Sequence, residues 1–130
     1  MSKAKITIEI SECYDRLSIN FVKLEKCQDI KKKETIREQI ELLEQEINVS
    51  IGRDLALKIF KSDEYKELYN VNLTLFNLVD EIKINPLVGK TIDDNVYLRH
   101  LAKNKIQKKF FNEEFKEVKL GYHDKNNSKM

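Results

Sequence analysis

The stretch YKELYNVNLTLFNLVDEI, residues 65–82, decides the fold class. Large apolar residues recur there at alternating steps of three and four, which is the spacing of one face of an α-helix. The positions on this face, which we call the seam, are Tyr65, Leu68, Asn72, Leu75, Val79 and Ile82. Nearly three heptads of the pattern indicate a helix that packs lengthwise on other helices. Ser62 and two acidic residues mark its start, and Asn85-Pro86 marks its end.

Three other segments carry the same spacing. Residues 11–26 follow Ser11, a candidate N-cap, and residues 34–51 precede Gly52, which suits a helix C-terminus. Residues 91–110 open with a capping-box-like pattern at Thr91. Asp29 is a candidate cap between the first two helices, and residues 53–61 suit a short helix or a loop. The apolar positions on these faces are Tyr14, Leu17, Phe21 and Leu24; Ile36, Ile40, Leu43, Ile47 and Ile51; and Leu98, Leu101, Ala102, Ile106 and Phe110.

These segments predict an all-α protein, an antiparallel bundle of three to four long helices. Residues 5–10 and 115–122 alternate between apolar and polar side chains, so a short strand pair between the two ends is an open addition to this fold. We expect one domain over residues 1–122 and a disordered polar tail over 123–130.

Composition excludes several classes of protein. Three glycines and one proline in 130 residues are too few for a collagen-like chain or for an all-β fold with many tight turns. The net charge of +2 shows no overall imbalance toward nucleic acid or membrane surfaces. No stretch is apolar and long enough for a signal peptide or a membrane span, so we expect a cytoplasmic protein with no membrane partner.

Polar residues on the helical faces are the candidate site. Asn72 takes a seam position, and a buried amide without partners costs about 1–3 kcal/mol. It either sets the register of the helices or lines a polar pocket. The candidate pocket consists of Asp15, Arg16, Lys23, Asn72, Glu81, Arg99 and Lys103. Interhelix ion pairs are the alternative interpretation of the same residues.

Metal and cofactor chemistry finds no support in the sequence. The two histidines, His100 and His123, lack the Glu-x-x-His pairing of helical di-metal sites. The three glycines cannot form a phosphate-binding loop. Cys13 and Cys27 would lie about 21 Å apart along one helix, too far for a disulfide. We therefore expect no metal and no cofactor.

The chain resembles a family of uncharacterised small bacterial proteins, a domain of unknown function often found among surface-polysaccharide genes. Three stretches carry the resemblance, of which the third comprises residues 103–106 with the later Glu117, Lys119 and Tyr122. The first is residues 11–26, which is similar to the family's opening pattern of Glu, Leu, any residue, Asp, Lys, Ile, Thr, Ile. The second is residues 68–83, where Phe76 replaces the family's usual Trp. Cys13 replaces the family's Leu, and residues 44–62 differ in length. The resemblance implies a helical fold and a role beside glycan-building enzymes.

Three functions fit these observations. The first is an interaction module that forms a homo-oligomer, with a further protein partner as an option, because wide apolar stripes in a small chain need covering. The second is a small helical enzyme that binds an anionic metabolite in a cleft of the bundle, using the candidate pocket. The third is nucleic-acid binding through the Lys103–Lys109 face, which the balancing acidic residues make the weakest of the three.

Overall fold

The computed structural model describes residues 7–82 and 84–112, and over these residues it is all-α. The prediction of the fold class is confirmed for this part of the chain. The elements are α1 (Ile10–Lys26), α2 (Ile30–Ile51), α3 (Arg53–Phe60), α4 (Asp63–Glu81), the short 3₁₀ helix η1 (Pro86–Val88) and α5 (Gly89–Phe111).

Several helix ends follow the local sequence signals. The Asp29 carboxylate accepts a hydrogen bond from the Lys32 backbone N–H at 3.1 Å, and the Ser62 hydroxyl accepts one from the Tyr65 backbone N–H at 3.1 Å. Gly52 ends α2 with φ of +84°, a conformation that favours glycine. These caps satisfy backbone groups that a helix end leaves unpaired.

Two predicted helix starts are wrong. The first helix begins at Ile10, and the Ser11 backbone N–H donates to Gln107 Oε1 at 3.1 Å, so a side chain of α5 replaces the expected cap. The last helix begins at Gly89, directly after η1, and therefore Thr91 lies within its first turn.

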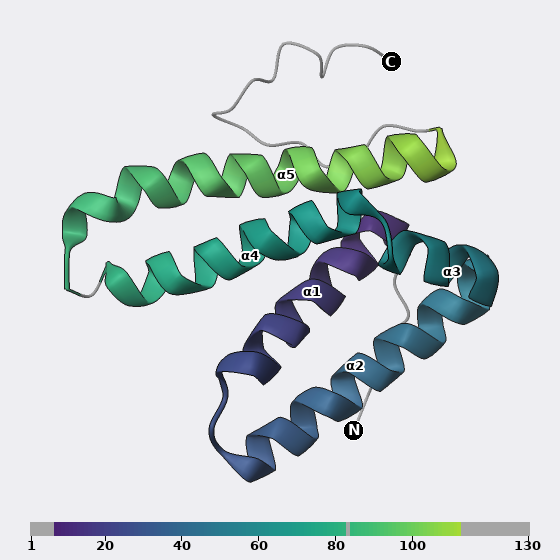
Figure 1. Ribbon diagram of the computed structural model, residues 1–130, viewed down its shortest axis with the longest axis horizontal. Coiled ribbons are helices and arrows are strands. Elements are labelled where there is room, and N and C mark those ends of the chain that lie inside the picture. The colour runs from purple at the N-terminus through teal and green to yellow at the C-terminus, as the bar shows by residue number, and fades with distance from the viewer. Residues whose placement is uncertain (1–6, 83, 113–130) are drawn as a thin grey trace.

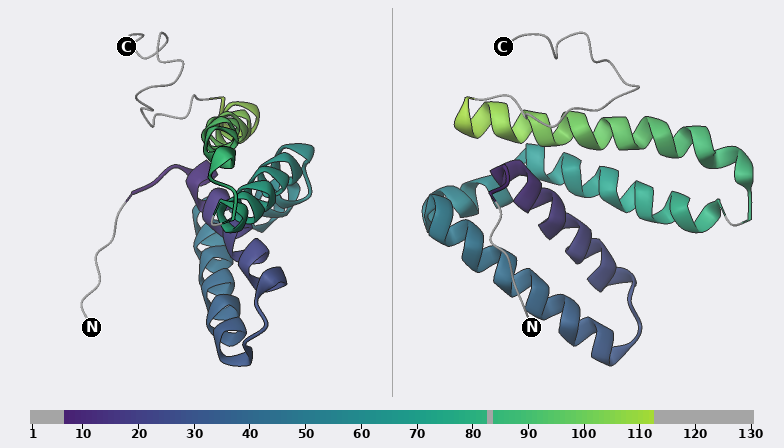
Figure 2. Two further views of the ribbon diagram at one scale, coloured as in Figure 1. Left: turned by 90° about the vertical axis from the view of Figure 1, so that its left-hand side faces the viewer. Right: turned by 180° about the vertical axis from the view of Figure 1, so that it is seen from behind.

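The long helices form two antiparallel pairs that cross, as Figure 1 shows. One pair is α1 with α2, and the other is α4 with α5. Helix α1 packs against α2, α4 and α5, whereas α3 joins α2 to α4 and packs on both. Figure 2 shows the same crossing from behind. The expected bundle of side-by-side helices is not confirmed, because α1 diverges from α4 after the crossing (Figure 1).

The core lies where the two pairs meet. Its buried apolar side chains come from all five α-helices and include Tyr14, Leu17, Ile40, Ile47, Ile59, Leu68, Ala102 and Ile106. Beyond the crossing, α4 and α5 continue past α1 as a pair of helices (Figure 1).

The predicted strand pair has no counterpart in the described residues. Residues 7–9 form no regular structure, and Ile10 already belongs to α1. Residues 5–6 and 115–122 lie outside the described residues, as do the predicted domain end at residue 122 and the predicted tail over 123–130.

Candidate functional site

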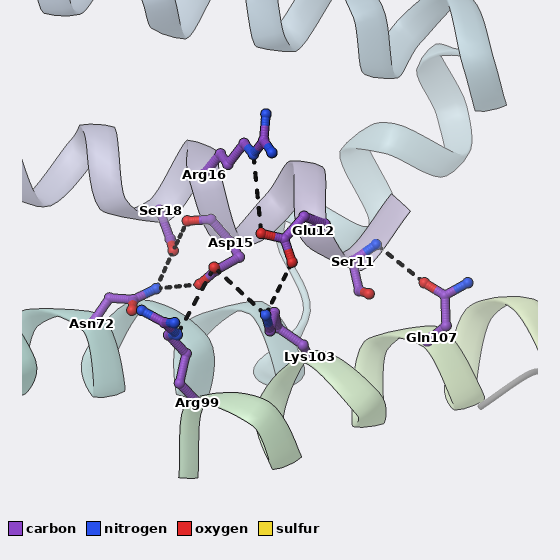
Figure 3. A network of polar contacts seen from close by, with 9 residues as sticks. All are labelled: Ser11, Glu12, Asp15, Arg16, Ser18, Asn72, Arg99, Lys103 and Gln107. Atoms are coloured by element: carbon purple, nitrogen blue, oxygen red, sulfur yellow. Dashed lines mark hydrogen bonds and ion pairs between the residues drawn. The ribbon is translucent and has the colours of Figure 1, made fainter. Parts of the chain in front are cut away.

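A group of polar side chains, most of them buried, lies where α1 crosses the α4–α5 pair (Figure 3). We call it the polar cluster: Glu12, Asp15 and Ser18 of α1, Asn72 of α4, and Arg99 and Lys103 of α5. Positions 11, 15 and 18 form a polar stripe with helical spacing on α1, and this stripe faces the other two helices.

Asn72 links α4 to α1. Its side-chain Nδ2 donates to Asp15 Oδ1 at 2.9 Å and to Ser18 Oγ at 2.7 Å. The Ser18 hydroxyl in turn donates to the backbone carbonyl oxygen of Asp15 at 2.8 Å. The amide therefore has partners and sits at a fixed register between the two helices, as the register interpretation expects.

Two cations from α5 face two carboxylates from α1. Lys103 Nζ lies 3.0 Å from Glu12 Oε2 and 3.9 Å from Asp15 Oδ2, and Arg99 Nε lies 4.0 Å from the same Asp15 oxygen. The Lys103 and Asp15 residues are 1% and 2% exposed. Buried charges need opposite partners, and this group balances two positive charges with two negative ones.

The candidate pocket is only partly assembled. Asp15, Asn72, Arg99 and Lys103 come together as predicted. Arg16 is at the edge, where its Nε lies 4.0 Å from Glu12 Oε1 and its side chain points away from α4 and α5 (Figure 3).

Lys23 and Glu81 do not join the cluster. Lys23 is exposed and lies about 12 Å further along α1 than Asp15. Glu81 is exposed and lies about 13 Å further along α4 than Asn72. Both residues therefore lie outside the segments of α1 and α4 that form the polar cluster.

Glu12, Ser18 and Gln107 were missed as members of this region. The stripe of positions 11, 15 and 18 is a signal for Ser18, because small polar residues on a buried face indicate a polar contact to another helix. Nothing in the local pattern of the last helix distinguishes Gln107, which is 2% exposed.

The polar cluster has the chemistry of a helix–helix contact. Its buried carboxylate, ammonium and amide groups bind one another. The two hollows described below are lined by other residues. Across the described residues, no group of three or more His, Cys, Asp and Glu side chains is placed to hold a metal ion. These contacts favour the ion-pair interpretation of the candidate pocket.

The basic face of α5 is largely paired with α4. Lys105 Nζ lies 2.9 Å from Glu67 Oε1, and Lys109 Nζ lies 2.9 Å from Glu64 Oε1. The hydrogen bond from Lys109 lowers the pKa of the Glu64 carboxyl below its ordinary value. Because Lys103 is buried as well, few of these lysines face solvent without a carboxylate beside them, which weakens the case for phosphate contacts.

The thiol nearest to the cluster is not activated. Burial raises the pKa of Cys13 above its ordinary value, so the thiolate form is disfavoured at neutral pH. Cys13 and Cys27 are both free cysteines.

The fold and the polar cluster define a small all-α protein whose buried charges join one helix to a helical pair. Over the part of the chain that the structure covers, none of the helices combines the length and the apolar character that crossing a bilayer requires. Comparison with models of known protein families, with curated proteins and with solved structures finds no match for the chain.

Proposed function

We propose that this protein is a helical interaction module that forms a homo-oligomer through the far end of its α4–α5 pair. The observation that supports the proposal is the change in exposure along the seam of α4. Leu68, Asn72 and Leu75 are 0%, 4% and 8% exposed, whereas Val79 on the same face is 51% exposed. The seam thus stays apolar beyond the crossing with α1.

Helix α5 shows the same change. Ile106 and Ala102 are 0% and 1% exposed, and Leu98, one turn nearer the far end, is 46% exposed. Ile84 and Leu87 in the connection between the helices are exposed too. We call Val79, Ile84, Leu87 and Leu98 the end surface. Exposed large apolar side chains, when they form a contiguous patch, are typical of an interaction site.

A second copy of the chain is the partner that fits this surface. Two helices alone leave one face of each uncovered, and the stable solution is a further layer of helices. The same end surface from a second copy supplies that layer about a twofold axis, which produces a four-helix arrangement.

Light scattering after size exclusion tests the proposal, because it gives the mass of the assembly at each protein concentration. We expect a dimer for the wild type and a monomer for Val79→Glu. Each dimer contains Val79 twice, so two buried valines are replaced by charges, and the dissociation constant should rise by at least about 100-fold. Circular dichroism checks that the variant remains folded.

Val49→Glu is the matched control, since Val49 is an exposed valine on α2, away from the end surface. It should leave the dimer intact. A wild type that stays monomeric at all concentrations would contradict the proposal, and so would equal weakening of the dimer by both variants.

The cytoplasmic setting and the role beside glycan-building enzymes, which the sequence and the resemblance suggest, remain part of this proposal.

A further inference from the structure

A hollow with aromatic walls lies between α1 and the start of α4, away from both the polar cluster and the end surface. Its volume is about 410 Å³, which is in the range of small-molecule sites. The residues that line it, which we call the aromatic hollow, are Phe21, Leu24 and Glu25 of α1, Phe60 of α3, and Tyr65 and Tyr69 of α4. Four of these six side chains are aromatic.

The rings stand at angles to one another. The Phe60 ring centroid lies 5.9 Å from that of Phe21 and 5.1 Å from that of Tyr65, with interplanar angles of 50° and 35°. Tyr65 is buried, and its hydroxyl makes no hydrogen bond to another described residue. The π-faces of such rings carry partial negative charge.

Glu25 is the one charged residue among the six, and it is exposed at the side of the hollow. The Tyr69 hydroxyl donates a hydrogen bond to Glu25 Oε2, which holds the carboxylate beside the rings. The lining described here includes no Lys or Arg. The carboxylate and the ring faces therefore attract the same kind of ligand, a cation.

A second hollow of the same molecule lacks this preference. It measures about 400 Å³ and is lined by Arg53 and Glu44 among apolar residues, so both charge signs are present. Of these two hollows, the aromatic hollow is the one whose lining favours a cation.

We propose that the aromatic hollow binds an organic ammonium group, of the quaternary or methylated kind, with the rings around the cation and Glu25 as its counter-charge. Aromatic rings recognise such ions by cation–π attraction when the nitrogen lies within about 6 Å of the ring centroids. A methylated nitrogen suits these walls better than a bare ammonium ion, because its methyl groups bury apolar surface against the rings.

Choline and 3,3-dimethyl-1-butanol, its neutral carbon analogue, are the probes. Both are titrated into the full chain while the aromatic ring resonances are followed by NMR. We expect choline to shift the rings of Phe21, Phe60 and Tyr69 saturably, with at least about five-fold tighter binding than the neutral analogue.

Two substitutions locate the binding. Glu25→Gln should weaken choline binding by about two- to five-fold, the effect of one exposed ion pair, and leave the neutral analogue unchanged. Phe21→Leu should weaken choline binding by about three-fold or more through loss of a ring face. Glu67→Gln, which changes an exposed glutamate of α4 outside the hollow, is the matched control and should have no effect.

Three results would overturn the proposal. Equal binding of choline and its neutral analogue would show an apolar hollow with no charge preference. Choline binding that neither Glu25→Gln nor Phe21→Leu weakens would place the cation elsewhere. Absence of any saturable shift of the ring resonances would show that no such site exists.

Discussion

Replacing Lys103 by Met should destabilise the fold far more than any surface lysine substitution does. Methionine keeps most of the apolar length of the side chain and removes its charge. The Asp15 carboxylate, 2% exposed, would then face only Arg99, whose Nε is 4.0 Å away, and the Asn72 amide. Removing one partner of a buried ion pair costs about 3–5 kcal/mol. We expect the lower end, about 3 kcal/mol, because the Glu12 side chain is 22% exposed and can turn to water.

Lys105→Met is the matched control on the same helix. Lys105 Nζ lies 2.9 and 3.0 Å from the two carboxylate oxygens of Glu67, distances like that between Lys103 and Glu12. The side chains of this pair are 56% and 46% exposed, however. An exposed ion pair contributes about 0–1 kcal/mol, so the control should lose no more than that.

Urea unfolding followed by circular dichroism measures both effects as free energies of unfolding. A second comparison uses Asp15→Asn with Lys103→Met in one chain. Removing both charges should recover part of the stability, because the main cost of the single variant is a carboxylate left without its ammonium partner. Equal losses for the two lysine variants, or a double variant whose loss is the sum of the single losses, would refute this account of the cluster.

Three further outcomes are expected. Asn72→Leu removes two buried hydrogen bonds and should cost about 2 kcal/mol in urea unfolding, against less than about 0.5 kcal/mol for the same change at an exposed asparagine of α4. Burial raises the pKa of Tyr14 and Tyr65, so their contribution to stability is complete below pH about 10 and falls as pH rises; in an alkaline absorbance titration, neither should ionise before the protein unfolds. Lys109→Gln should raise the pKa of Glu64 toward 4.5 in an NMR titration, and the stability difference from the wild type should close as pH falls through the lowered pKa of that carboxyl.

Local signals in the sequence predict the helices and several of their ends, although α4 ends at Glu81, four residues before the predicted stop at Asn85-Pro86. Asp29, Gly52 and Ser62 act as caps through contacts to residues at most four positions away, so their roles can be inferred from a short window. The predicted N-cap role of Ser11 is wrong because the contact that matters there is not local. The partner of its backbone N–H is Gln107, 96 positions away, and no local pattern records such a contact.

The candidate site shows the same limit. Asp15, Asn72, Arg99 and Lys103 were chosen because they are polar residues on or beside buried faces, and the structure brings them together. To predict which polar residues along a helix form the site, one must also know the position along the helix axis at which two helices contact each other. Periodicity gives the face of a helix but not the position along its axis at which a neighbouring helix makes contact. The pattern therefore predicts Glu81 as a site residue and does not predict Glu12.

The closed polar cluster and the uncovered end surface have one geometric cause. A first helix aligned with α4 along its whole length, as the predicted bundle requires, would cover Val79. Helix α1 instead crosses α4 near Asn72 and then diverges (Figure 1). Charged groups at the crossing therefore find partners within the chain, while Val79, on the seam beyond it, is 51% exposed. The crossing thus leads us to expect a structural role for the polar cluster and an assembly role for the end surface.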